Sequence, residues 1–132
     1  MIDLKAEEET IVNALKGAIT YLHIEAYPDQ PLTYNLKHHK GAVLVRFDGA
    51  EGDEPVEWSN EYQVRRYRWA IVVAIKDRSG HEGVYETLVK VDETLTSLKI
   101  RDHHLRYLRT EYLTYDTRDG AWIYRTYYEI IN

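Results

Sequence analysis

One long run of alternating residues, Tyr62 to Asp77 (YQVRRYRWAIVVAIKD), constrains the fold of this chain more than any other feature. Successive side chains on a strand point to opposite faces of a sheet. One face of this run is aromatic and branched, and the other changes from arginine to alanine and valine toward the carboxyl end. Because both faces become apolar there, we predict a strand near the centre of a sheet, covered on both sides.

Two amphipathic helices are predicted, one before this strand and one after it. The first is expected to end near Tyr27-Pro28, because the residue before a proline disfavours the helical conformation. The second is expected from about Gly83 to Leu98. Apolar residues recur at helical spacing in both: Leu4, Ile11, Leu15, Ala18 and Leu22 in the first, and Val84, Leu88, Val91, Leu95 and Leu98 in the second.

Three further strands complete the predicted fold. Gly41 to Gly49 is typical of a buried strand, and the runs Leu105 to Tyr115 and Ala121 to Ile131 are joined by a link containing Asp119-Gly120, a favoured hairpin turn. We therefore predict an α+β fold in the order α-β-β-α-β-β. Its two helices are expected to pack on one face of a four-stranded, mainly antiparallel sheet.

Length and charge exclude several classes of protein. A chain of 132 residues fits one domain, which we expect to span residues 1–132. The net charge of -5 argues against nucleic acid as the main partner. The absence of cysteine excludes disulfides and thiolate chemistry, and no apolar run approaches the roughly 20 residues of a membrane span. We expect an intracellular, soluble protein without a membrane partner.

Metal binding and catalysis are not expected. The histidine pairs His38-His39 and His103-His104 would point to opposite faces of a strand, so solvated histidines are the simpler interpretation. The carboxylates Asp53 and Glu54 lie in a charged segment where nothing would desolvate them and raise their pKa. No nucleophile elbow, phosphate-binding loop or dinucleotide motif is present. We predict no enzyme activity, no cofactor and no metal site.

The segment Asp48 to Glu61 contains six acidic residues and no basic residue. It is expected to be a solvated loop or hairpin tip. Trp58 within it is of a type enriched among interface anchors, although burial on the chain's own sheet is an equal alternative. An arginine cluster follows directly, interleaved with Tyr62 and Tyr67.

Three interpretations of these arginines stay open. They could stack and bind nucleic acid, form a solvated strand face, or contact the acidic loop of a neighbouring subunit. The candidate interface residues are Asp53, Glu54, Glu57, Trp58, Arg65, Arg66 and Arg68. The 12 tyrosines, against one phenylalanine, also favour protein interfaces.

The order of these segments resembles a known family. The segments that carry the resemblance are IVNALKGAI, GAVLVRFDG, RRYRWAIVVAIKDR, VYETLVKVDETLTSL and YRTYYEI. Together they resemble the tail terminator, or tail completion, proteins of Mu-like phages and prophages. The resemblance covers nearly the whole chain and rests on pattern and order, since the family has no catalytic motif to match.

The resemblance implies a structural role in the virion tail, with assembly in the cytoplasm of the bacterial host. Such a protein forms a ring, expected to be a hexamer, on the last ring of the tail tube. It ends tube growth and offers a docking surface to head-neck connector proteins. Its partners would be its own copies, the tube protein and the connector proteins, and the acidic loop would be a candidate for the tube contact. The alternative is a small intracellular protein-binding module unrelated to tails.

Overall fold

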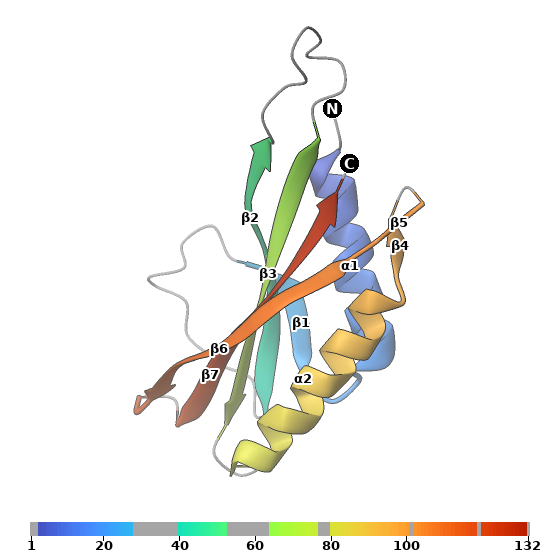
Figure 1. Cartoon of the computed structure of the whole chain (residues 1–132). Helices are drawn as coiled ribbons and strands as arrows, with labels where there is room; N and C mark the ends of the chain where they lie inside the picture. Colours follow the sequence, from blue (N-terminus) through green and yellow to red (C-terminus); the bar gives the residue numbers. More distant parts are fainter. Residues whose placement is uncertain are drawn as a thin grey trace, which may run out of the picture.

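The computed structural model describes residues 3–27, 40–52, 64–76, 80–100, 102–118 and 120–131, with the backbone alone for residues 80–82. Within these described residues, two helices and seven strands follow one another (Figure 1). Their bounds are α1 Leu4–Ala18, β1 His23–Ala26, β2 Gly41–Gly52, β3 Arg65–Lys76, α2 Gly80–Thr96, β4 Lys99–Ile100, β5 His103–His104, β6 Arg106–Asp116 and β7 Ala121–Ile131.

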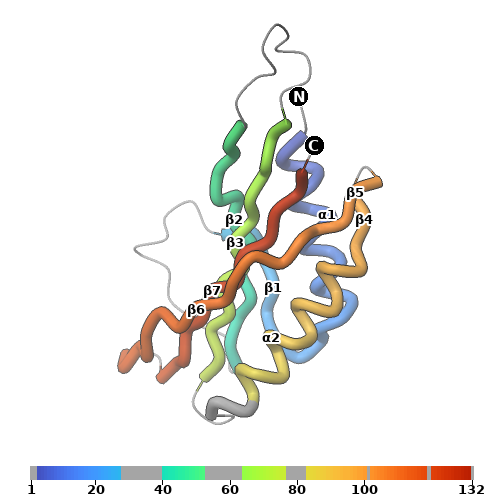
Figure 2. The backbone as a smooth tube through the Cα atoms, in the orientation of Figure 1, coloured from blue at the N-terminus to red at the C-terminus, as the bar shows by residue number. Residues whose placement is uncertain are grey.

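Five of the strands form one mixed sheet, in the order β1-β2-β3-β7-β6. Strand β1 pairs with β2 in parallel, and all other neighbours are antiparallel. Strand β3 lies in the middle, between β2 and β7, as the long alternating run predicts. Strands β4 and β5 form a separate two-stranded sheet. Figure 2 traces the chain through these pairings.

The predicted four-stranded sheet in the order α-β-β-α-β-β is wrong. Helix α1 ends at Ala18, and Ile19 already has extended backbone angles (φ -119°, ψ 98°). The chain then forms β1, which the sequence analysis assigned to the helix. Leu22 misled the prediction, because it lies at helical spacing from Ala18 and also packs against the core from outside the helix.

The small sheet of β4 and β5 was also missed. Each strand has two residues, which is too short to show an alternating pattern. The turn between them places Asp102 at a positive φ of 65°, a conformation that aspartate tolerates better than most residues. The other long elements lie where they were predicted, with shifts in their bounds. β7 has the predicted bounds, β6 is shifted by one residue at each end, and α2 spans Gly80–Thr96 instead of about Gly83 to Leu98. Strand β2 continues to Gly52, so the first residues of the segment predicted to be a loop or hairpin tip belong to a strand.

Both helices pack on one face of the five-stranded sheet (Figure 1). Ile11 and Leu15 of α1 and Leu95 of α2 are fully buried against Trp69 and Ile71 of β3. Burying each such side chain contributes about 1.5–3 kcal/mol. Neither helix, among the described residues, is long and apolar enough to cross a membrane.

The opposite, helix-free face of the sheet is divided into two parts. One part is apolar and includes Leu44, Val72 and Ala74, which are buried in a second, smaller cluster. Toward the amino end of β3 the same face becomes charged. Arg66 and Arg68 lie on it there, whereas the later residues of the strand on this face are alanine and valine. This charged part holds the largest group of ionic contacts among the described residues.

Candidate functional site

The strand register aligns charges across the helix-free face. Arg68 of β3 lies opposite Glu129 of β7, and Glu129 lies opposite Arg106 of β6. Arg125 of β7 in turn lies opposite Glu111 of β6. Cross-strand pairs of opposite charge stabilise a sheet, whereas like charges would repel. We call this surface the arginine face, and define it by Arg46, Arg66, Arg68, Arg106, Arg109 and Arg125 with Asp48, Glu51, Glu111, Glu129 and Tyr127.

Glu129 is the buried centre of the arginine face. Its side chain is 2% exposed and accepts hydrogen bonds from Arg106 and, at 3.4 Å, from Nη1 of Arg66. Nε of Arg68 lies 3.9 Å from its other oxygen. A buried carboxylate is destabilising unless it is paired, so these arginines are held close to Glu129.

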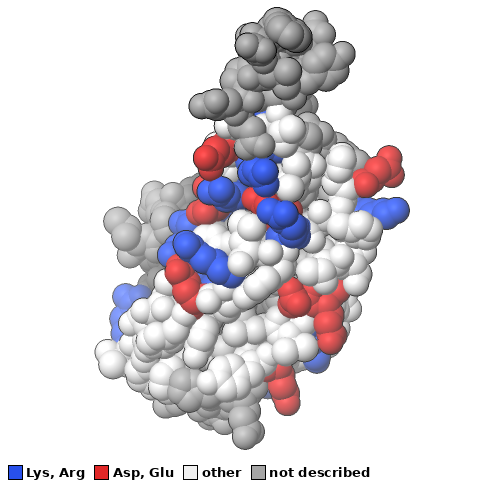
Figure 3. All heavy atoms as spheres, viewed as in Figure 1, with Lys and Arg blue, Asp and Glu red and all other residues white. Residues whose placement is uncertain are grey.

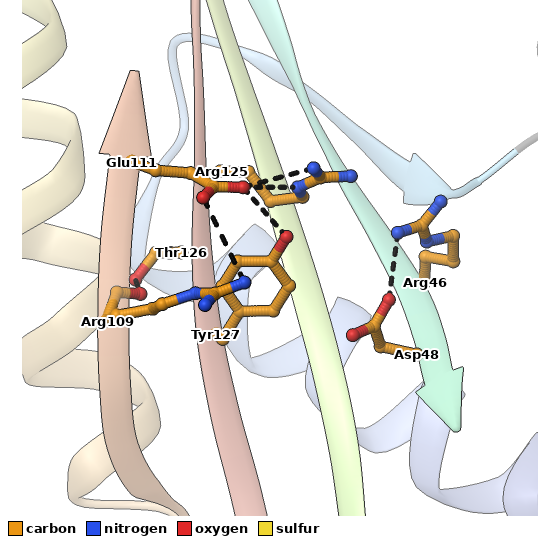
Figure 4. Close-up of polar contacts among 7 residues, drawn as sticks. All are labelled: Arg46, Asp48, Arg109, Glu111, Arg125, Thr126 and Tyr127. Carbon is orange, nitrogen blue, oxygen red and sulfur yellow. Dashed lines mark hydrogen bonds and ion pairs between the residues drawn. The ribbon is translucent and has the colours of Figure 1, made fainter. Parts of the chain in front are cut away.

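Glu111 organises the part of the arginine face nearest the sheet edge (Figure 4). Its Oε1 accepts hydrogen bonds from Nη2 of Arg125 at 3.1 Å and from the Tyr127 hydroxyl at 2.9 Å. The hydrogen bond from Tyr127, followed by that from Arg125, lowers the pKa of Glu111 below its usual value. Glu111 is therefore protonated only at a lower pH than an ordinary glutamate.

Tyr127 also orders two guanidinium groups. The Arg109 guanidinium lies 4.6 Å from the centre of the Tyr127 ring, and that of Arg125 lies 5.3 Å from it. A cation over an aromatic ring is attracted by about 0.5–1 kcal/mol at an exposed site. Arg109 is nevertheless 67% exposed, so most of its hydrogen-bond donors face solvent.

The third part of the arginine face lies over β2 and β3. Nη2 of Arg46 lies 2.9 Å from Asp48, and Nη2 of Arg68 lies 3.1 Å from Glu51. A hollow of about 260 Å³ over β2, β3, β7 and β6 is lined by Asp48, Arg68, Leu108, Arg109 and Tyr127. In the view of Figure 3, Lys and Arg side chains gather toward the left and centre with acidic side chains among them.

The arginine face is positive on a negative molecule. Its six arginines exceed its four carboxylates by two, whereas the whole chain has a net charge of -5. Such a surface attracts an anionic partner, and its interspersed carboxylates dictate where the partner's charges can lie.

The structure separates the arginines that sequence analysis grouped. Arg66 and Arg68 lie together on the arginine face. Arg65 points to the other side of β3, where it lines a hollow of about 370 Å³ with Leu4 and Tyr67. The four other candidate interface residues, Asp53, Glu54, Glu57 and Trp58, lie outside the described residues.

The histidine pairs are placed only in part. His103 and His104 are exposed on β5, and His38 and His39 lie outside the described residues. Within the described ranges, no group of three or more histidines and carboxylates is arranged to hold a metal ion.

Sequence reasoning did not group most residues of the arginine face into one site. The residues that it did not group are Arg46, Asp48, Glu51, Arg106, Arg109, Glu111, Arg125, Tyr127 and Glu129. A partial signal was present, since Arg125, Tyr127 and Glu129 alternate along the last strand and so share one face. The pairing of β7 with β3 connects segments far apart in sequence, and alternation within one strand does not identify its partner.

A second surface lies along β6, the edge strand of the five-stranded sheet. Tyr107 and Tyr112 are 47% and 52% exposed there, on the helix side of the sheet. Their rings contact Tyr128 and Tyr124 of β7, with centroids 5.8 and 5.4 Å apart. We call β6 with these two tyrosines the β6 edge; no other described strand pairs with its outer side.

The comparisons with known proteins identify a family. The family model described as "Gp37 protein" matches residues 11–129, and the chain belongs to this phage-associated family. A solved structure is similar in fold, with a TM-score of 0.61 at 9% identity over 98% of this chain and 92% of that chain. No curated protein matches the chain.

Proposed function

We propose that this chain is a structural tail protein that caps the tail tube as a ring, ends tube polymerisation and provides the docking surface for head-neck connector proteins. The ring is a hexamer, it acts without catalysis, and it forms in the bacterial host before becoming part of the virion tail. Membership of a phage-associated family supports the phage setting of this proposal.

The observation that carries the proposal is the β6 edge. Two aromatic side chains on one face of this strand are about half exposed, and tyrosine is enriched in subunit interfaces. The exposed tyrosines Tyr107 and Tyr112 stand on an eleven-residue edge strand, which extends the contact along the strand. A head-to-tail contact between one such edge and a different surface of the next copy gives a ring when the rotation between copies closes after six steps.

The contact is made through side chains rather than through an added strand. The register of β6 against β7 shifts between Tyr107 and Arg109 and again between Tyr112 and Thr114. Bulges of this kind interrupt the regular row of backbone donors and acceptors that edge-to-edge pairing requires. The β6 edge is therefore protected from open-ended aggregation while its tyrosines remain available to a specific neighbour.

The competing function is a small binding module unrelated to tails, for which the arginine face would be the binding surface. The two functions differ in their response to the tube protein. Native mass spectrometry of the purified chain, alone at high concentration and with purified tube protein, tests the first. A complex with six copies of this chain is expected when tube protein is added. A strict monomer under both conditions contradicts the ring.

A further inference from the structure

We propose that the arginine face binds the acidic segment of a second copy of this chain through residues 53–61, which follow β2. That the occupant is a second copy rests on the proposed ring, in which this contact sets the orientation of neighbouring subunits. The preference of the arginine face for carboxylates follows from its own geometry.

The arginine face retains hydrogen-bond donors beyond those its own carboxylates use. Arg106 and Arg109 are 60% and 67% exposed, and Arg68 is 41% exposed. Each guanidinium has five N–H donors, and planar pairing with a carboxylate uses two of them. Glu129, Glu111 and the Tyr127 ring hold these groups in place, which reduces the entropy lost when a partner binds.

Charge complementarity identifies a carboxylate-rich occupant. Residues 53–61 contain Asp53, Glu54, Glu57 and Glu61 and no basic residue. The contact between Arg68 and Glu51 at 3.1 Å shows a carboxylate from the end of β2 binding an arginine of this face within one chain. The proposed contact repeats that pairing between copies, at Arg106, Arg109 and the exposed part of Arg68.

The same surface is poorly suited to nucleic acid. A phosphate backbone carries regularly spaced negative charges and favours continuous rows of cations. On the arginine face Asp48, Glu51 and Glu111 lie between the arginines and would repel such a backbone. A peptide can place uncharged residues at those positions, as Pro55 and Val56 would within residues 53–61.

The test uses a fluorescent peptide of residues 53–61, titrated with the full chain and followed by anisotropy. Binding is expected, and it should weaken about tenfold between low and moderate salt because both surfaces are exposed. Arg109→Gln should weaken binding about fivefold, since it removes one exposed charge pair. Arg65→Gln is the matched control, because it removes the same charge from the other side of β3 and should leave the affinity unchanged.

Three outcomes overturn the proposal. The first is no binding, and the second is an equal loss of affinity in Arg109→Gln and Arg65→Gln. A DNA oligonucleotide that binds tighter than the peptide and displaces it would instead assign the face to nucleic acid, and also overturns the proposal.

The failure of this proposal differs from the failure of the ring. If the chain assembles with tube protein equally well with and without Arg109→Gln, the docking of the acidic segment is wrong and the ring stands. If the peptide binds as expected but the chain never assembles, the ring and the second copy as occupant are both wrong, and the preference of the arginine face for carboxylates remains.

Discussion

Nη1 of Arg66 lies 3.4 Å from Oε1 of Glu129, and the two residues are 63 positions apart in the chain. Glu129 is 2% exposed and Arg66 is 29% exposed, so the pair sits at the boundary between core and solvent. Because Arg106 binds the same oxygen, one carboxylate connects β3, β7 and β6. The arginine face is therefore part of the structure of the sheet as well as a candidate contact surface.

Replacing Glu129 by glutamine should destabilise the protein. The variant Glu129→Gln leaves three arginines without their buried countercharge. These arginines are partly exposed and recover some hydration, so the free energy of unfolding should fall by about 1–3 kcal/mol. Urea denaturation at neutral pH measures this change.

The control for Glu129→Gln is Glu51→Gln. Glu51 pairs with Arg68 but is 63% exposed, so its loss should cost under about 1 kcal/mol. Equal destabilisation by the two substitutions would contradict the central position of Glu129.

Tyr128 should make stability depend on alkaline pH. Burial, and then its contact with Asp92, raise the pKa of Tyr128 well above its usual value of 10. Its hydroxyl donates to Oδ1 of Asp92 at 3.0 Å. The neutral phenol is favoured in the folded state, so its contribution is complete below about pH 10 and is lost as pH rises toward the raised pKa.

The variant Tyr128→Phe isolates this contribution. At neutral pH it should lower the free energy of unfolding by about 1 kcal/mol, because Asp92 loses a donor. Between pH 7 and about pH 11 the wild-type free energy of unfolding should then fall more steeply than that of the variant. Parallel curves, measured by urea denaturation at each pH, would show that Tyr128 has no raised pKa.

A charge introduced at the β6 edge should weaken assembly and leave the stability of the fold nearly unchanged. Tyr112→Lys introduces a cation at a side chain that is 52% exposed, so the fold should lose under about 1 kcal/mol. In a subunit interface the same cation would be buried without a partner, and assembly with tube protein should fall about tenfold or more.

Val64→Lys is the matched control for Tyr112→Lys. Val64 is 37% exposed just before β3, which β7 separates from β6, and it gains the same charge. If both substitutions reduce assembly equally, as measured by native mass spectrometry, the β6 edge has no special role in the ring.

The sequence predicted the parts of the fold whose patterns are long. Strand β7 shows alternation over its whole length, and α2 shows helical spacing over several turns, so both could be located from local pattern alone. Strand β1 could not be located in this way, because its four residues are too few to show an alternating pattern that would distinguish them from the end of a helix. Gly17, one residue before the end of α1, was the available signal that the helix stops there.

The arginine face was predictable only in its β3 portion. Arg66 and Arg68 could be placed on one face by alternation, and the same rule separates them from Arg65. The buried position of Glu129 could not be predicted, since an acidic residue near the end of a chain is usually exposed. Its burial depends on the pairing of β7 between β3 and β6, which local sequence does not encode.

The central claim, that this chain ends tail-tube growth, is tested most directly by tail length. A phage or prophage in which the gene for this chain carries an early stop codon should produce tubes of irregular, extended length without attached heads. Expression of the intact chain from a plasmid should restore a single tail length, and expression of Tyr112→Lys should not. Tails of normal length with heads attached, in the absence of the chain, would contradict the account.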